Sequence, residues 1–452
     1  MGGKGRKGGK GRMGRIGTML LTLQVLCLSS LPASPAPPAF PAPPANPTSP
    51  AQQVPFEQAS RDLTSSDAET RLRAVQLLRE AAYPEAAVPL ARAVADTQDE
   101  VQLAAIGAEL NIFLAEKIVA RKRVALVVEI RNQILAEPAF SAGPSALGAL
   151  PVPAEVLDAL RFAARDDNPR VALEALYAFG TLGSAPARAE RREFLTRSGS
   201  DVASLLGAAD PAKRYAAARV MGRLFARRTH DGPIEPSVGD AVITALNDSD
   251  RAVKTAAMNA LGAMRYERGV QALTDLFTFY GKGDNAEAAL DALAHIAHTA
   301  SAPLLVAQLT GKNSALRVIA IEGLGRLGDP GRLAEVRTAA DADRSDSVAL
   351  ASAFASAVLD NGSVERIVEA LTKPKLRDRA RQYIAEIAAK RVAAFSPHLM
   401  DPDERIRLDI VEAVGLTGDP AALPLVEPLL TDRDEQVQRA AERAVARLRS
   451  AR

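Results

Sequence analysis

Apolar residues recur every fourth residue in a unit that the chain repeats from about residue 60 onward. In this unit an apolar residue, here called position 0, is followed by apolar residues at +4 and +8 and by Gly or Ala at +9. Residues four apart lie on one face of an α-helix, so each copy predicts a helix with one apolar stripe. The small residue at +9 predicts that another helix approaches closely as this one ends. The clear copies begin at Val171, Val253, Leu316, Leu376, Ile406 and Val437, and weaker ones begin at Asn285 and Val348.

The copies recur at a nearly constant interval. From Val253 onward they begin at residues 253, 285, 316, 348, 376, 406 and 437, a period of roughly 28–32 residues. This period accommodates two helices and two turns. A self-similar period of this size indicates a solenoid, because no single unit can bury its own stripe. Looser copies begin near Leu72, Val101 and Lys213, and about ten to twelve repeats are predicted in all.

Turn residues separate the predicted helices. Acidic residues precede several copies, and Asp at an N-cap accepts hydrogen bonds from the first N–H groups of a helix. Gly-Asp-Pro follows other copies, where Gly ends one helix and Pro suits the start of the next, such as a second helix over 421–430. Residues 138–153 are rich in Pro, Gly, Ser and Ala and predict a loop. The acidic segments begin at Asp166, Asp248, Asp401 and Asp432, and the Gly-Asp-Pro segments begin at Gly328 and Gly418.

These units resemble HEAT repeats, particularly the short bacterial form that is also seen in phycobilisome-lyase-like proteins. The resemblance rests on the Asp cap, an aliphatic residue followed by a basic or amide residue, Ala at +4 and a Leu-Gly ending; it covers about residues 60–452. It implies an all-α fold, an α-solenoid of stacked antiparallel helix pairs (a HEAT-like superhelix), with a curved platform for binding proteins. The aliphatic-basic and aliphatic-amide pairs are Val253-Lys254, Leu316-Arg317, Ile406-Arg407 and Val437-Gln438.

Composition agrees with helices that pack on one another. Hydrophobic residues make up 47% of the chain, but only 4% are aromatic and Trp is absent. Ala and Leu favour helices, whereas β-sheets favour β-branched and aromatic residues. The single cysteine, Cys27, lies in the apolar N-terminal stretch. A mature chain without it has no disulfide, no thiolate metal site and no cysteine nucleophile.

The N-terminus has the layout of an export signal. A basic run, an apolar segment of residues 16–31 and small residues after it predict a signal peptide over 1–33. Two alternatives stay open: a retained inner-membrane anchor, or a cytoplasmic protein with a misread start. Residues 34–58 predict a Pro/Ala-rich disordered linker, since ten prolines fall within 32–55. The solenoid is then predicted over 59–452. Export places it in the periplasm or outside the cell.

Charge argues against nucleic acid as an obligatory partner. The formal net charge is +2, but residues 1–15 hold six cations and no acid. Without those six, 50 of the 56 basic residues remain against 54 acidic ones, so the folded part is mildly acidic. Nucleic-acid binding depends on neutralising phosphates with Lys and Arg. A protein partner is therefore expected, and a membrane is expected only through a retained N-terminal segment.

One basic series stands out within the repeats. Arg219, Arg223 and Arg227 are spaced i, i+4 and i+8, so they predict one charged stripe on a helix. Like charges at this spacing repel one another, which favours an acidic protein partner. The alternative is a solvated stripe that acidic residues of a neighbouring repeat neutralise. Further arginines one helix earlier could widen the surface: Arg188, Arg191 and Arg192.

Two other groups are candidates. Phe279 and Tyr280 fall near a helix end and are candidate partner contacts, because aromatic residues are enriched at binding hot spots; packing between repeats is the alternative. His295 and His298 lie three apart, with Asp291 one turn before His295. That spacing allows a metal site on one helix face, although a fourth ligand is not evident and chance surface histidines are the alternative.

The sequence predicts a non-catalytic scaffold. It contains no Gly-rich phosphate loop, no Gly-x-Ser-x-Gly and no His-Glu-x-x-His motif. The paired acids recur at helix starts and are explained as caps. We therefore expect an exported adaptor, without cofactor or metal, that binds a protein partner on the concave face formed by the second helices. The alternatives are an accessory subunit of an enzyme complex, or a lyase or isomerase of the HEAT-like bilin-lyase type. The sequence specifies no oligomeric state.

Overall fold

A computed structural model describes residues 56–115, 134–148, 150–184, 190–226 and 232–450. The predicted signal peptide and nearly all of the linker lie outside these residues. The described secondary structure is helical, apart from one isolated bridge between Leu114 and Leu147. None of the described helices combines the length and apolarity needed to cross a membrane. Residues 54–452 form one compact unit.

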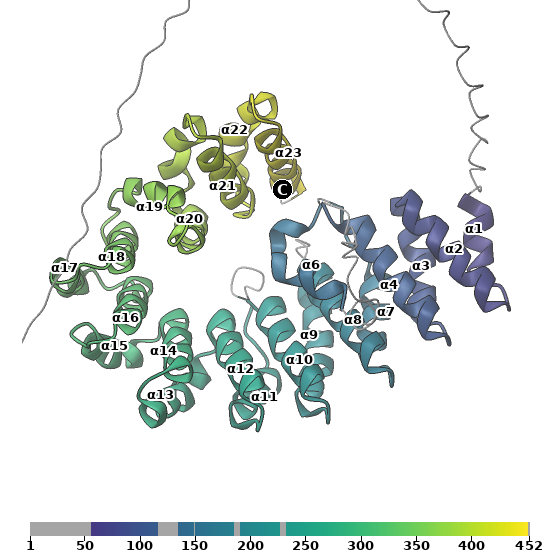
Figure 1. The fold of residues 1–452 in the computed structure, drawn as a ribbon, viewed down its shortest axis with the longest axis horizontal. Helices are drawn as coiled ribbons and strands as arrows, with labels where there is room; N and C mark the ends of the chain where they lie inside the picture. Colours follow the sequence, from purple (N-terminus) through teal and green to yellow (C-terminus); the bar gives the residue numbers. More distant parts are fainter. Residues whose placement is uncertain (1–55, 116–133, 149, 185–189, 227–231, 451–452) are drawn as a thin grey trace, which may run out of the picture. The chain divides into compact units, whose positions relative to one another are not determined.

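Helices of the predicted unit form the inner layer of this unit (Figure 1). They pack on one another along the row, and each also packs on the outer segment before it, which for α21 is the 3-10 helix η9 (Val392–Met400). The inner helices are α2 (Ala68–Ala81), α4 (Asp99–Phe113), α8 (Pro169–Leu182), α10 (Pro211–Leu224), α12 (Arg251–Met264), α14 (Asp284–Ile296), α16 (Ser314–Leu327), α18 (Asp346–Leu359), α20 (Arg377–Arg391), α21 (Glu404–Gly415) and α23 (Glu435–Ser450).

Outer helices are shorter than the inner ones, except for the 15 residues of α9, and often begin or end in 3-10 turns. The outer helices are α1 (Phe56–Asp62), α3 (Ala87–Val94), α7 (Ala154–Ala163), α9 (Glu190–Ser204), α11 (Pro236–Thr244), α13 (Val270–Tyr280), α15 (Ala302–Gln308), α17 (Leu333–Asp341), α19 (Glu365–Glu369) and α22 (Leu423–Val426). The prediction of one helix over 421–430 was wrong, because a 3-10 turn lies on each side of α22. Pro420, Pro424 and Pro428 interrupt the N–H ladder there. The concave side is lined by the inner helices, so its assignment to the second helices was also wrong.

Small residues set the spacing of the inner layer. The Gly at +9 of one inner helix faces position +7 of the next. A Cβ built on Gly262 would lie 3.0 Å from the Cα of Ala292, and one on Gly325 would lie 3.0 Å from that of Ala355. A larger side chain would push the backbones apart. The predicted close approach at +9 is confirmed, and its partner is the next inner helix.

Arginine residues link successive repeats. The basic residue after position 0 reaches the acidic turn of the next repeat, as Arg214 does to Asp248 and Arg407 to Asp432. These hydrogen bonds hold the pKa of Asp248 and Asp432 below their usual range. In the turns at Asp248, Asp401 and Asp432 the N-cap is the acid two residues later; Asp250, for example, accepts from Ala252 and Val253. In the turn at Asp166 the cap is Asn168. The predicted caps are confirmed, and the first acid has a separate function as the arginine partner. Equivalent links join Arg71 to Asp96 and Arg317 to Asp343.

The predicted loop at 138–153 is partly helical. It contains most of α6 (Ala136–Ala142) and the 3-10 turn η2 (Pro144–Ala146). Helix α6 packs on α8 and lies on the concave side of the row (Figure 1). The content of Pro, Gly, Ser and Ala predicted a loop, but a helix forms because distant helices bury three of its side chains, those of Ala136, Ala139 and Phe140. In the last inner helix, Arg447 donates to the carbonyl oxygens of Ser145 and Leu147.

Candidate binding surface on the concave side

Helix α6 is held by three polar side chains of the inner helices beneath it. The carboxylate of Glu174 on α8 accepts hydrogen bonds from the backbone N–H groups of Leu135 and Ala136, each at 2.7 Å. Arg219 on α10 forms an ion pair of 2.6 Å with Glu137. Arg223 on α10 donates to the carbonyl oxygen of Phe140 at 2.9 Å. Side chains of the inner helices therefore bind this short helix at its N-terminus, at its acidic residue Glu137 and near its C-terminal end.

Aromatic rings and guanidinium groups surround Phe140. Its ring centre lies 4.4 Å from the guanidinium carbon of Arg223 and 5.0 Å from that of Arg219. The ring of Tyr177 packs on it at 5.3 Å. Gly180 leaves the space for it, since a Cβ at that position would lie 2.7 Å from the Phe140 ring. These contacts combine aromatic packing with cation–π attraction.

Two arginines of the predicted stripe thus contact α6. Burial opposes a higher pKa for Arg219, but the hydrogen bond to Glu137 and the neighbouring Tyr177 and Tyr215 together raise that pKa. Burial and the charge of Arg219 lower the pKa of Arg223 to about 10. The sequence left open that acidic residues neutralise the arginine stripe, and an acidic residue does neutralise Arg219. Its partner, Glu137, lies 82 residues earlier in the chain and not in the neighbouring repeat. Arg188 and Arg227 lie outside the described residues, as do the side chains of Arg191 and Arg192.

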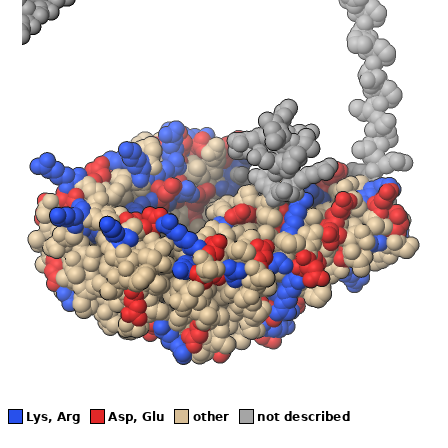
Figure 2. Space-filling view, turned by 60° about the horizontal axis from the view of Figure 1, so that its bottom comes forward, with Lys and Arg blue, Asp and Glu red and all other residues tan. Residues whose placement is uncertain are grey.

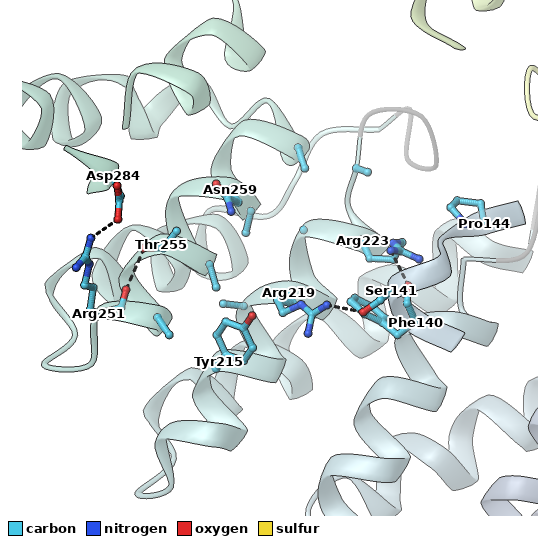
Figure 3. Close-up of a pocket in the computed structure, with 17 residues that line it drawn as sticks. Phe140, Ser141, Pro144, Tyr215, Arg219, Arg223, Arg251, Thr255, Asn259 and Asp284 are labelled. Atoms are coloured by element: carbon cyan, nitrogen blue, oxygen red, sulfur yellow. Dashed lines mark hydrogen bonds and ion pairs between the residues drawn. The ribbon is translucent and has the colours of Figure 1, made fainter. Parts of the chain in front are cut away.

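A cleft of about 860 Å³ opens beside α6, over α10 and α12 (Figure 3). Its alanine-rich surface includes Ala256, Ala260 and Ala263. Around it stand Phe140 and Ser141 of α6, Tyr215, Arg219 and Arg223 of α10, Thr255 and Asn259 of α12, and the pair Arg251–Asp284 at the far side. Three arginines and one aspartate line the cleft, and Glu137 pairs with one of these arginines, so a small excess of positive charge remains at its edge. Such a cleft suits an apolar segment that carries acidic residues.

The two exposed-aromatic candidates differ. Phe279 is 81% exposed on the outer helix α13, whereas Tyr280 is partly buried and packs against the core. Their rings contact each other edge to face at 5.1 Å. Phe277 of the same helix is buried. Neither Phe279 nor Tyr280 lines the concave cleft.

The three candidate metal ligands do not form one site. Asp291 and His295 form an ion pair of 3.4 Å on α14. Burial opposes the charged imidazole, but the hydrogen bond and charge of Asp291 raise the pKa of His295 overall. His298 lies beyond the end of α14 and accepts a hydrogen bond from the backbone N–H of Ala300. Across the described residues, no three His, Cys, Asp or Glu side chains are arranged to hold a metal ion.

Sequence reasoning missed a second polar group on the concave side. Glu322 of α16 accepts hydrogen bonds from Arg379 and Tyr383 of α20, and Arg326 of α16 donates to Glu386 of α20. The sequence pattern could have identified this group, because Glu322 and Arg326 lie at +6 and +10 of their repeat. Arg219 and Arg223 occupy the same positions in theirs. Polar residues at +6 and +10 therefore mark the concave face.

Charge on the opposite side is mixed. On the face drawn in Figure 2, Lys and Arg side chains are interspersed with Asp and Glu. A mixed surface carries little long-range field, so the local charge of the cleft is the better guide to a partner.

A family model for HEAT repeats matches residues 199–278 and 364–446. The chain is a HEAT-repeat protein. The matched segments include α10 and α12, which form the cleft, and α20 and α21 in the C-terminal part. A search of curated proteins finds no match.

Solved structures match the chain at low identity and with low TM-scores. An engineered protein from a structural genomics consortium is 19% identical, with a TM-score of 0.37, over 87% of this chain and 98% of that chain. The complex of CpcE and CpcF of phycocyanin lyase from Nostoc sp. PCC7120 is 20% identical, with a TM-score of 0.37, over 55% of this chain and 94% of that chain. Kap95p in a structure with RanGDP is 16% identical, with a TM-score of 0.34, over 88% of this chain and 50% of that chain.

Proposed function

We propose that this protein is an exported, non-catalytic scaffold that binds an acidic segment of a protein partner in the cleft beside α6. The observation that carries the proposal is the cleft itself, which has an alanine-rich surface between two helices of the inner layer and arginines at its edge. Small side chains allow a partner backbone to approach closely. The arginines supply attraction for carboxylates and orient the partner.

The size of the cleft agrees with a segment rather than a whole domain. A volume of about 860 Å³ lies within the range of sites for small ligands or a few residues of peptide. The cleft also contains few ionisable groups beyond arginine and aspartate, which are poor candidates for proton transfer near neutral pH. This composition favours binding over catalysis.

A blocked cleft tests the proposal directly. Asn259 is exposed and lines the cleft, so Asn259→Trp fills the cleft without disturbing the core. We expect residues 34–452 to capture a partner from an extract of the source organism, and the Asn259→Trp variant to lose it. Phe279→Ser is the matched control, because it changes an exposed aromatic on the outer helix α13. Loss of the partner with Phe279→Ser but not with Asn259→Trp contradicts the proposal.

Export is tested separately. We expect the protein recovered from the periplasmic or extracellular fraction to begin after residue 33, within the proline-rich segment. N-terminal sequencing of the purified protein measures this. A full-length chain in the membrane fraction would indicate a retained anchor, and one in the cytoplasm would contradict export.

A further inference from the structure

The surface under α6 has the features of a receptor for a specific short helix. We infer that the concave surface of α8 and α10 binds a partner helix that carries an acidic residue one turn before an aromatic residue, and that α6 occupies it in the free protein. This inference rests on the proposed function and names the chemistry of the partner segment. In α6 the two residues are Glu137 and Phe140.

Each part of the surface binds a different part of the helix. Glu174 accepts two backbone N–H groups at the start of α6, and such contacts require a helix terminus but no particular side chain. Arg219 binds the acidic residue through the ion pair to Glu137. The space over Gly180, bordered by Tyr177 and Arg223, accommodates the aromatic ring. Spacing of three residues places Glu137 and Phe140 on one face of the helix.

Helix α6 is an addition to the row of helices. Seventy residues separate Val101 from Val171, whereas the later repeats recur every 28–32 residues. Helix α6 fills neither an inner nor an outer place, and its seven residues are too few for a helix that is stable alone. The surface on α8 and α10 is built differently, because these helices pack directly on each other. Helix α6 therefore depends on this surface more than the surface depends on α6.

The following turn keeps α6 close to its surface. The backbone N–H of Gly148 donates to the carbonyl of Phe113, and that of Ala115 donates to the carbonyl of Ala146. Arg447 of α23 donates to the carbonyls of Ser145 and Leu147. A segment tethered by a short linker has an effective concentration on the order of millimolar. A partner segment must overcome this competition, so the tether sets the apparent affinity.

A synthetic peptide of residues 134–146 tests the inference by fluorescence anisotropy. In the Glu137→Ala/Phe140→Ala protein the internal competitor is weakened, so we expect this variant to bind the peptide about tenfold or more tightly than the wild type does. Adding Arg219→Glu should abolish that binding. A control peptide with alanine at both positions should not bind. Equal binding to both proteins, or no binding to a double variant that melts like the wild type, overturns the inference.

Hydrogen exchange on the wild-type protein gives an answer that needs no folded variant. We expect the amides of α6 to exchange faster than those of α8 and α10, and to lose protection further when excess peptide is added. Protection of α6 equal to that of α8, unchanged by the peptide, shows a fixed structural element and overturns the inference.

The two proposals fail in different ways. If the captured partner is lost with Asn259→Trp but the peptide does not bind, the inference fails and the proposed function stands. If the peptide exchanges with α6 but no partner depends on the cleft, the receptor surface stands and the proposed function fails.

Discussion

The inner layer is built in two ways along the chain. From α12 to α18 successive inner helices contact through glycine and alanine, as at Gly262–Ala292 and Gly325–Ala355. Between α18 and α20 position +7 is Tyr383, a fully buried ring that stacks on Phe354 at 4.3 Å. The hydrophobic core divides at this joint, because one cluster of buried side chains ends within α18 and a second begins there.

Where the large side chain of Tyr383 replaces a small residue at position +7, ion pairs and hydrogen bonds take the place of close helix packing. Glu322 and Arg326 of α16 reach past α18 to contact Arg379, Tyr383 and Glu386 of α20. Burial, and then the charge of Glu322, raise the pKa of Tyr383 well above its usual value, so its hydroxyl stays protonated and donates. The regular part is stabilised by shape, and the joint is stabilised by paired charges. Pairing matters because an unpartnered buried charge is strongly destabilising.

Removing the central carboxylate should have the largest effect. Glu322→Ala leaves the guanidinium of Arg379 and the hydroxyl of Tyr383 without this acceptor, and we expect a loss of about 3–5 kcal/mol in the free energy of unfolding. Urea denaturation measures it. As control, Asp284→Ala breaks the exposed pair with Arg251 and should cost less than about 1 kcal/mol. Equal losses would contradict a special role for the joint.

Enlarging a glycine in the regular part should cost less. Gly325→Val places side-chain atoms against the backbone of Ala355, and we expect a loss of about 1–3 kcal/mol in the free energy of unfolding. Gly207→Ala is the matched control, since nothing lies within 4 Å of its added Cβ, and it should change stability by less than about 0.5 kcal/mol. Thermal unfolding compares the two. A tolerated valine would show that shape is not limiting there.

A buried carboxyl group without a partner should behave in the opposite way to Glu322. Glu109 lies at +8 of its repeat, where all six clear copies are apolar, and neither carboxylate oxygen has a hydrogen-bond partner among the described residues. Replacing it with leucine should therefore stabilise the protein by about 1–3 kcal/mol near neutral pH. Urea denaturation at pH 7 measures this, and a destabilised variant would indicate an unrecognised partner.

The pH dependence sharpens this test. Burial raises the pKa of Glu109 well above its ordinary value of 4.5. The folded protein thus holds this proton more tightly than the unfolded chain does. The contribution of the group to stability is full below pH 4.5 and is lost as the pH rises toward the folded pKa. The Glu109→Leu variant should lack this decline, whereas a matched Glu57→Leu change on exposed surface should keep it.

Removing one hydroxyl should have the smallest effect. Tyr383→Phe keeps the stack on Phe354 but removes the hydrogen bond to Glu322, while Arg379 still pairs with that carboxylate. We expect a loss of about 1 kcal/mol in the free energy of unfolding. Denaturation curves of this variant and of Glu322→Ala together separate the hydroxyl from the rest of the network.

Much of the fold could be predicted because it depends on local patterns. The stripe at +4 and +8 follows from the helical period, and the Asp caps follow from the N–H groups that every helix start leaves unpaired. The helix at 136–142 could not be predicted in this way, since a short helix forms only when distant residues cover it. The charged residues at position +6, Arg219 and Glu322, can be found in the sequence. That they lie on the concave face is known only once the direction in which the layer curves is known.

The repeating helices, their caps and the small residues at +9 follow from the sequence alone, because these depend on hydrogen bonds and side-chain periodicity within one or two turns. Which helices line the concave side, and which charges meet there, depends on how the whole chain folds. Glu137 lies 82 residues before Arg219, and Glu322 lies 57 before Arg379. No local period relates such pairs; the stacking of the whole row brings them together, and with them the cleft where we place the function.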